Sequence, residues 1–269
     1  MPKGTGMLLA IDIGNTNVTL GVFQGDAMKA SWRMSTSVHR ESDEYAVLLL
    51  NMLQHECISP SSITEAVICS VVPPLAPTFV ELCQRYFHTE PLVVETGVKT
   101  GIRIAMDNPR EVGADRVVNA AAARHLFGGP LIVIDFGTAT TFDVVSREGE
   151  YIGGAISPGV ALGAEALFTR TAQLPRVELV HPKNVIGKGT VSAMQSGILY
   201  GYVGLVEGMV ARIQAEMGRK AKVIATGGLS SLIARETTVI NAVEPDLTLI
   251  GLRIVYELNR QQASQTTHQ

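Results

Sequence analysis

The sequence lacks the features that mark several functional classes. It has no run of basic residues, and 22 Lys and Arg against 25 Asp and Glu give a formal net charge of −3. A nucleic-acid or anionic-membrane surface needs concentrated positive charge, so neither partner is expected, and a small-molecule partner fits better. Only 17% of residues are charged, against a usual figure of about 25%. This deficit of charge hints that part of the surface is covered in an oligomer.

Cysteine is also scarce. Cys57, Cys69 and Cys83 form no CxxC pair and lie in apolar helix or strand patterns, which predicts buried free thiols rather than disulfides or a metal site. Free thiols suit a reducing cytoplasm. The N-terminal apolar run is interrupted by Asp12, so neither a signal peptide nor a membrane span is predicted. Residues 1–6 are expected to form a loose tail, with Met7 as an alternative start.

What the sequence does contain is one pattern that occurs twice. Residues 8–23 read LLAIDIGNTNVTLGVF and residues 131–145 read LIVIDFGTATTFDVV. In each copy a β-prone run ends in Ile-Asp, small polar residues follow around a glycine, and a second β-prone run begins, which predicts strand, tight turn and strand. The copies lie nearly half the chain apart. We therefore predict a duplicated domain, divided into residues 1–128 and 129–269.

The two turns have the chemistry of phosphate-binding loops. Gly14 and Gly137, flanked by Asn and Thr, permit tight turns that direct backbone N–H groups and hydroxyls to one point, which suits phosphate oxygens. Asp12 and Asp135 each lie at the end of the strand before the turn, where a carboxylate can hold a hydrated divalent cation beside the phosphates. A single such hairpin is more often a plain turn. Repetition at domain spacing instead favours two loops that grip a nucleoside triphosphate from both sides.

Each hairpin continues into a third strand and then into alternating helices and strands. The other expected strands are Lys29–Thr36, Glu65–Val72, Pro91–Glu95, Tyr151–Ile156 and Lys222–Thr226. The expected helices are Ser42–Glu56 with Ser42 as its cap, Leu75–Phe87, a helix after Gly113, Thr190–Met217 and Leu247–Arg260. Residues 171–189 have little periodicity and are expected to form a mobile loop.

Two features of the helices have open interpretations. Asp115 falls in the first turn of the helix after Gly113, where an acidic residue can either serve function or merely satisfy the helix dipole. The helix Thr190–Met217 has four glycines on one face, and each costs about 1 kcal/mol relative to Ala. Close helix–helix approach would offset that cost, within the chain or across the two-fold axis of a homodimer, and we favour the dimer. These glycines are Gly197, Gly201, Gly204 and Gly208.

One apparent motif is rejected. Lys188-Gly189-Thr190 looks like the end of a Walker A motif, but Pro182 stands where that motif needs its first glycine. A P-loop is therefore not predicted.

The two hairpins resemble the phosphate loops of the acetate and sugar kinase, Hsp70 and actin superfamily. Within it, the motifs DIGNTN, NPREVGADR, IDFGTATTFD and GGAISPG resemble type III pantothenate kinase, and the similarity spans Leu8 to about Leu258. The resemblance implies an α/β fold of duplicated actin-like (ribonuclease H-like) domains, each a mixed five-stranded sheet flanked by helices.

The resemblance also implies an activity. A member of this family phosphorylates pantothenate to 4′-phosphopantothenate with ATP, the first step of coenzyme A biosynthesis, and works as a cytoplasmic homodimer with Mg²⁺ or a similar divalent cation and with K⁺ or NH₄⁺. Two alternatives remain: a kinase of the same fold with another hydroxyl acceptor, and a non-catalytic nucleotide-binding regulator. A regulator would need the phosphate loops but no carboxylate at the acceptor site, so the combination of Asp12, Asp115 and Asp135 favours an enzyme.

Roles for individual residues follow from the resemblance. Asp115 would be the catalytic base that accepts the proton of the acceptor hydroxyl, Asp135 a ligand of the monovalent cation, and Asp12 a ligand of the divalent cation with the phosphates. The implied ATP-binding residues are Asp12, Ile13, Gly14, Asn15, Thr16, Asn17, Val18, Thr19 and Thr138. The implied substrate-binding residues are Met106, Gly113, Ala114, Asp115, Arg116 and Thr190.

This chain departs from the family pattern at two of these places. Met106 stands where the family usually has Tyr, so a flexible thioether replaces a phenol in the wall of the acceptor pocket. Gly189 replaces the Asn of the family's GKNT pattern, in which the Thr contacts pantothenate. Thr190 keeps that role here or simply caps its helix.

Overall fold

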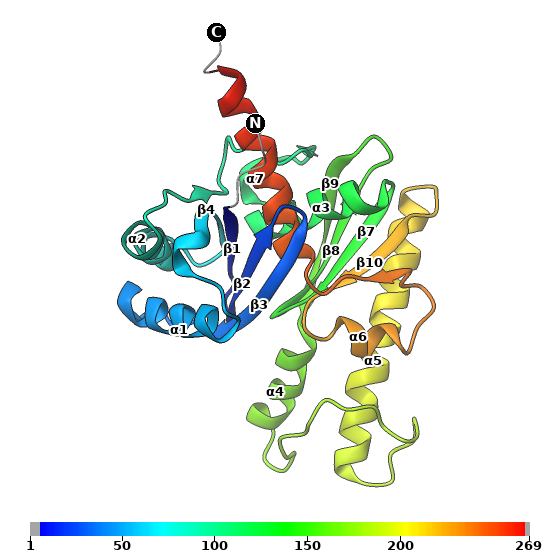
Figure 1. The fold of residues 1–269 in the computed structure, drawn as a ribbon. Coiled ribbons are helices and arrows are strands. Elements are labelled where there is room, and N and C mark those ends of the chain that lie inside the picture. The colour runs from blue at the N-terminus through cyan, green and yellow to red at the C-terminus, as the bar shows by residue number, and fades with distance from the viewer. Residues whose placement is uncertain (1–5, 267–269) are drawn as a thin grey trace. The chain divides into compact units, whose positions relative to one another are not determined.

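The computed structural model describes residues 6–266, so residues 1–5 of the expected tail lie outside the described residues. Backbone contacts divide the chain into two compact units (Figure 1). The first comprises the described parts of Met1–Ile102, Asn108–Ala122 and Thr248–Gln269, and the second comprises Arg103–Asp107 and Ala123–Leu247. The boundaries 1–128 and 129–269 stay a prediction about the duplication, whereas the contacts group the last helix with the first unit.

The first unit is built on a five-stranded mixed sheet in the order β3-β2-β1-β4-β5. The first three strands form an antiparallel meander, and β4 and β5 continue the sheet in parallel to β1. Their bounds are β1 (Met7–Ile13), β2 (Asn17–Gln24), β3 (Ala27–Ser35), β4 (Ile63–Ser70) and β5 (Leu92–Val93).

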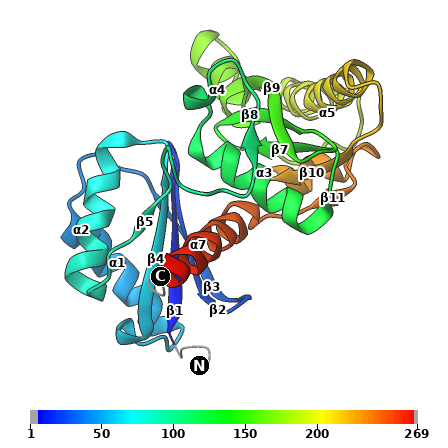
Figure 2. The same ribbon diagram turned by 90° about the horizontal axis from the view of Figure 1, so that it is seen from above.

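Helices cover both faces of this sheet. Figure 2 shows α1 (Ser42–His55) and α2 (Ala76–Phe87) on one face and α7 (Leu247–Thr266) on the other. Successive side chains of a strand point to opposite faces, and the packing of β1 follows this rule. Leu9, Ile11 and Ile13 pack with α1 and α2, whereas Leu8 and Ala10 pack with α7 and with α3 (Ala114–Phe127).

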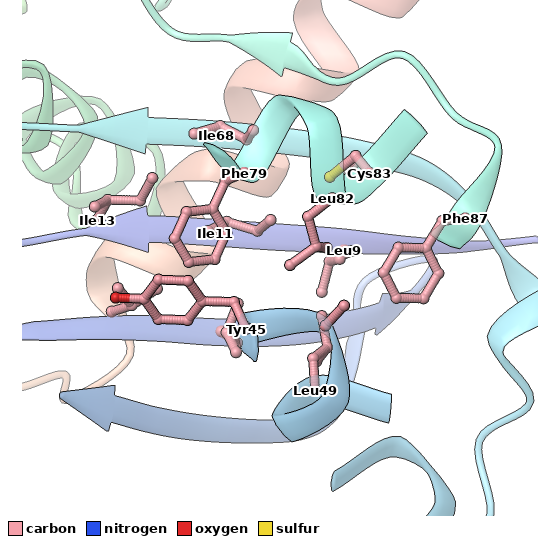
Figure 3. Packing of buried hydrophobic residues seen from close by; sticks show 14 of the residues in the cluster. Leu9, Ile11, Ile13, Tyr45, Leu49, Ile68, Phe79, Leu82, Cys83 and Phe87 are labelled. Atoms are coloured by element: carbon pink, nitrogen blue, oxygen red, sulfur yellow. The ribbon is translucent and has the colours of Figure 1, made fainter. Parts of the chain in front are cut away.

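The core under α1 and α2 is apolar and closely packed (Figure 3). Tyr45 of α1 and Phe79 of α2 are fully buried, with ring centroids 4.7 Å apart. The Tyr45 hydroxyl accepts from the Ser37 amide at 2.9 Å and lies 3.2 Å from the Ser37 carbonyl, so its polar end is satisfied. Burial of each large apolar side chain contributes about 1.5–3 kcal/mol, which makes this cluster the main support of the first sheet.

The other face depends on a close approach between α3 and α7. A Cβ at Gly251 would lie 2.5 Å from the carbonyl oxygen of Val118, so α7 can reach α3 only where no side chain intervenes. Beside this contact the Thr248 hydroxyl donates to Oδ1 of the buried Asn119 at 2.7 Å. These contacts bring the C-terminal helix onto the first sheet although it follows the second sheet in sequence.

The second unit repeats the topology of the first. Its six-stranded sheet has the order β11-β10-β7-β8-β9-β6, with β7, β8 and β9 as an antiparallel meander and β10 and β11 parallel to β7. The two-residue β6 pairs with β9 and adds one strand to the five that were expected. The duplicated actin-like α/β class is confirmed. The bounds are β6 (Arg103–Ile104), β7 (Leu131–Phe136), β8 (Ala139–Val145), β9 (Glu150–Pro158), β10 (Lys222–Thr226) and β11 (Ala242–Val243).

One face of this sheet is covered by α4 (Val160–Arg170), α5 (Thr190–Glu216) and α6 (Ser230–Ala234). Ile132, Ile134 and Phe136 of β7 point into that core. Asp135 therefore lies on the opposite face, just as Asp12 lies on the face of the first sheet away from α1 and α2. No helix within residues 6–266 combines the length and the apolarity needed to span a membrane.

Several local predictions need correction. The cap of α1 is Glu41, whose backbone and side chain exchange hydrogen bonds with Glu44, so Ser42 is the first helical residue. Cys57 is exposed, and only Cys69 and Cys83 are buried, although all three thiols are free. The last helix continues to Thr266, beyond the expected end at Arg260. Short 3₁₀ helices also occur, namely η1 (Pro60–Ser62), η2 (Pro73–Leu75) and η3 (Pro109–Glu111).

Candidate active site

The first predicted phosphate loop is a tight turn between β1 and β2. The Gly14 N–H donates to the Asn17 carbonyl at 3.0 Å and closes the turn. The residue that follows β3 supports it, because Thr36 donates its hydroxyl to the Gly14 carbonyl at 2.7 Å and its N–H to the Thr16 carbonyl at 3.0 Å. Asn15, Thr16 and Asn17 are exposed. The loop thus offers its polar groups to solvent on a fixed base.

Asp12 stands at the mouth of this turn. It is half-buried and is aligned with Thr19 of β2 and with Cys69 of β4. The alternation of β1 turns its side chain to the same face as Leu8 and Ala10, the face that α3 and α7 cover. Asp12 is therefore directed to the side of the sheet where the first turn of α3 lies.

The start of α3 positions Asp115. The N–H groups of Arg116 and Val117 donate to the Gly113 carbonyl at 3.1 and 3.2 Å, which makes Gly113 the residue that opens the helix. Oδ1 of Asp115 accepts the N–H of Arg116 at 2.8 Å, so the carboxylate folds back over the helix N-terminus. A Cβ at Gly113 would lie 2.6 Å from that oxygen. The glycine of the GADR sequence is thus required for the carboxylate to occupy this position.

The buried thiol of Cys69 reports on both carboxylates. Its side chain is fully buried and packs in one cluster with Val118 and Ala114 of α3. Burial raises the pKa of the Cys69 thiol well above its ordinary value, and the carboxylates of Asp12 and then Asp115 raise it further. Two carboxylates distant in sequence therefore act on one buried thiol. The first unit brings the mouth of its predicted phosphate loop and the base candidate to the same end of its sheet.

The second turn joins β7 to β8. Gly137 and Thr138 are exposed, and Asp135 is half-buried opposite Thr141. Gly227, at φ +87° after β10, lies so close that a Cβ there would overlap Oδ1 of Asp135 and would be 2.8 Å from the backbone of Phe136. Backbone therefore forms one wall beside the Asp135 carboxylate, where no side chain could stand.

A buried polar network next to this turn was missed from the sequence. Asp143 of β8 is fully buried; its Oδ1 accepts from the Tyr151 hydroxyl at 2.7 Å and its Oδ2 from the Thr141 hydroxyl at 3.1 Å. By alternation Asp143 and Thr141 share the face of Asp135. The signal for it is the alternation Thr141-Phe142-Asp143-Val144 in β8, which places two polar side chains on one face of the strand.

The remaining predicted residues belong to the second unit. Met106 is half-buried and lies just after β6, and Thr190 is the exposed first residue of α5. Gly189 occupies the cap position, so Thr190 is not the cap. Thr190 lines an apolar groove of about 790 Å³ between α4 and α5. Each unit thus carries its own part of the predicted site: Asp12 and Asp115 in the first, and Asp135, Thr138, Met106 and Thr190 in the second.

The donor set suits a metal held jointly with a ligand. Within residues 6–266 no three His, Cys, Asp or Glu side chains are grouped so that they could hold an ion by themselves. Mg²⁺ is commonly bound by one or two carboxylates together with substrate phosphates and water. A carboxylate beside a predicted phosphate loop, as at Asp12, has the donor set for that arrangement.

Comparison with known proteins identifies the family. The model of type III pantothenate kinase matches residues 8–212, which include both turns and the GADR sequence. The chain belongs to the type III pantothenate kinase family. It is 55% identical to a type III pantothenate kinase of Dehalococcoides mccartyi (strain CBDB1) over 256 residues, 95% of this chain and 97% of that protein.

Solved structures agree on the fold. A protein of Campylobacter jejuni named as a Baf family transcriptional activator has a TM-score of 0.57 and 18% identity, over 94% of this chain and 99% of that one. One of Sinorhizobium meliloti named as a 2-dehydro-3-deoxygalactonokinase has a TM-score of 0.55 and 15% identity, over 93% and 96%. Both likenesses place this member of the type III pantothenate kinase family among proteins with the actin-like fold.

The environment of the cysteines predicts their reactivity. Burial, together with Glu90, raises the pKa of Cys83 to about 12, and Cys69 is shifted in the same direction. Because the thiolate is the reactive form, both thiols stay protonated and inert at pH 8. We expect a thiol reagent to label one cysteine per folded chain, the exposed Cys57, and three after denaturation.

The variant Cys57→Ser is the control and should show no labelling while folded. Rapid labelling of a second thiol in the folded wild type would contradict this description of Cys69 and Cys83.

Proposed function

We propose that this protein is an ATP-dependent kinase that transfers a phosphoryl group to pantothenate and forms 4′-phosphopantothenate, the first step of coenzyme A biosynthesis. The observation that carries the proposal is the position of both carboxylates at one end of the first sheet: Asp12 is aligned with Cys69 of β4, and Cys69 packs with Ala114, which precedes Asp115 in the first turn of α3. A phosphate loop and a base candidate at one end of one sheet are what a phosphoryl transferase needs. The 55% identity with a type III pantothenate kinase over 95% of the chain supports this acceptor.

ATP and a divalent cation are assigned to the two turns. Asp12 would hold a hydrated Mg²⁺ together with the phosphates, and residues 13–19 would bind them through the exposed N–H groups and hydroxyls of the turn. Thr138 would contact ATP from the second turn. When bound, the cation neutralises charge on the transferring group. The chain's own contribution is to hold the turns in place, as Thr36 does for the first.

Asp115 is assigned as the group that orients the acceptor hydroxyl and accepts its proton. Its position at the N-terminus of α3 favours the ionised carboxylate, because the helix dipole is positive there. Arg116 would bind the carboxylate of pantothenate in a fork-shaped contact, with Gly113 and Ala114 forming the adjoining backbone. Met106 and Thr190 would line the acceptor site. Catalysis in this arrangement is mostly positioning and charge stabilisation.

A monovalent cation, K⁺ or NH₄⁺, is assigned to Asp135. The Asp135 carboxylate is half-buried at the mouth of the second turn, on the same face of the sheet as the Thr141 hydroxyl. The backbone of Gly227 lies against it, where no side chain could stand. A carboxylate with a hydroxyl on the same face suits a weakly charged, weakly hydrated ion.

We further propose that the protein is a homodimer through α5. A Cβ at Gly197, Gly201 or Gly204 would meet no atom within 4 Å, so no part of the described chain packs directly against these three positions. The same unit exposes several large apolar side chains, which an interface would cover. They are Ile156, Leu162, Phe168, Val185, Ile186 and Val191. A cytoplasmic location is also proposed, on the basis of three free cysteines.

Single-turnover transfer tests the reaction, the base and the ion together. With Mg²⁺ and ATP, wild-type enzyme should form phosphopantothenate faster in potassium than in sodium buffer. Asp115→Asn should slow the step by about 10²- to 10⁴-fold, the usual contribution of a positioned general base. Asp43→Asn is a matched control, because Asp43 also lies in the first turn of a helix but is 57% exposed on α1.

If a folded wild type that binds ATP forms no product from pantothenate, the acceptor assignment fails, and other hydroxyl acceptors should be tested before a regulatory role. Equal rates of phosphoryl transfer in potassium and sodium buffer would contradict the assignment of a selective monovalent-cation site to Asp135.

Gly113→Ala tests the positioning of Asp115. The added methyl group would lie 2.6 Å from Oδ1 of Asp115 and should displace the carboxylate, so we expect kcat/KM for pantothenate to fall by about 10- to 100-fold. The unfolding free energy should change by less than about 1 kcal/mol, since only the end of a side chain must move. ATP affinity should stay unchanged. A variant with wild-type activity would show that the Asp115 position is not critical.

Gly201→Leu tests the dimer. A leucine on the bare face of α5 should prevent close approach of a second copy, so sedimentation should detect a monomer. An unchanged dimer would exclude this face as the interface.

A further inference from the structure

Tyr202 of α5 joins that helix to the junction between β9 and α4. Its hydroxyl oxygen lies 2.9 Å from the carbonyl oxygen of Pro158 and 2.9 Å from that of Gly159. A phenol has one proton and no other donor, so it donates to these carbonyls in turn or to both at once. Burial raises the pKa of Tyr202, so its hydroxyl keeps this proton at physiological pH.

The same junction lies directly against the second phosphate turn. The Gly159 N–H donates to the Thr138 carbonyl at 3.1 Å. A Cβ at Gly159 would lie 2.6 Å from the carbonyl oxygen of Gly137 and would overlap that of Thr138. The backbone of Gly159 therefore contacts the backbone of the Gly137–Thr138 turn directly, so a displacement of the junction would also displace the turn.

The hydrogen bonds at Gly159 form a continuous series. Its carbonyl accepts the N–H of Gly163 at 3.0 Å, the first bond of α4, as well as the Tyr202 hydroxyl. A carbonyl has two lone pairs, so both donors can be accommodated. A Cβ at Gly163 would lie 3.2 Å from the Tyr202 hydroxyl oxygen, so a glycine at this position leaves the space that the hydroxyl needs.

We propose that Tyr202 is a positioning residue for the kinase reaction: its hydroxyl fixes the β9–α4 junction, and the junction holds the Gly137–Thr138 turn in the geometry that binds nucleotide phosphates. The inference rests on the ATP-binding role proposed above for Thr138. Tyr202 acts through backbone and touches neither reactant. Because it also lines the groove between α4 and α5, it ties the long helix to the nucleotide site.

A purely structural role makes a different prediction. The Tyr202 ring packs against the apolar core of the second unit, and a residue that served only this core would affect stability without affecting one substrate more than another. The positioning role instead predicts weaker nucleotide binding with little effect on the acceptor.

The test is Tyr202→Phe, which keeps the ring and removes the hydroxyl. Calorimetric titration with Mg-ATP, without acceptor, should show a Kd about 3- to 10-fold higher, the size expected for one lost hydrogen bond. The KM for pantothenate should stay within about twofold. Tyr200→Phe is the matched control, since Tyr200 lies one position before Gly201 on α5 with its ring edge-on to His181, 6.4 Å between centroids, and its variant should bind ATP as wild type does.

Gly163→Ala gives a second, independent test. The methyl group crowds the hydroxyl in the wild-type background and should also weaken ATP binding. In the Tyr202→Phe background there is no hydroxyl to crowd, so the same substitution should add no further loss. Such non-additivity would show that both positions act through one hydroxyl.

The outcomes separate this inference from the proposed function. Wild-type ATP affinity in Tyr202→Phe, with or without a lower melting temperature, overturns the positioning role and leaves the kinase assignment intact. Normal ATP binding by the wild type without transfer to pantothenate overturns the acceptor assignment and leaves the role of Tyr202 to be decided by the titrations. A wild type that does not bind ATP overturns both.

Discussion

The register of the central strands is the constraint on which the rest of the structure depends. In β1, Leu9, Ile11 and Ile13 must enter the core under α1 and α2, which turns Asp12 to the opposite face, and a shift of one residue would exchange the two faces. The same constraint acts on β7, where the burial of Ile134 and Phe136 leaves Asp135 on the other side. Hydrophobic burial therefore determines the face of the sheet on which each carboxylate lies. It also fixes the strand ends from which the two tight turns begin.

Glycine occurs at the positions where backbone packs directly against the polar groups of the candidate site. Gly113, Gly159 and Gly227 each stand where a side chain would collide with Asp115, with the second turn, or with Asp135. A glycine destabilises a helix or strand by about 0.5–1 kcal/mol relative to alanine. At these positions only a glycine lets the backbone approach a carboxylate or a carbonyl. Gly251 serves the scaffold in the same way, since it lets α7 reach α3.

The charged and polar groups of the site are held by buried partners rather than by surface pairs. Asp115 is held by the Arg116 N–H at the start of α3, and Asp143 is held by Tyr151 and Thr141 inside the second unit. A buried polar group is costly when its partner is missing, so each of these groups tolerates few alternative positions. The site thereby gains rigid geometry, which phosphoryl transfer by positioning requires.

The local elements could be predicted from the sequence, because each follows from the pattern of neighbouring residues. The alternation of apolar residues in the two hairpins, the strand Lys222–Thr226 and the place of Asp115 in the first turn of α3 could all be predicted. The packing of the whole chain sets the contacts between residues distant in sequence: α7 joins the first sheet, Cys69 packs against α3, Tyr202 reaches Gly159, and Cys57 stays exposed. Periodicity records which face of an element is buried, but it does not record the partner that covers it, and that partner is chosen by the packing of the whole chain.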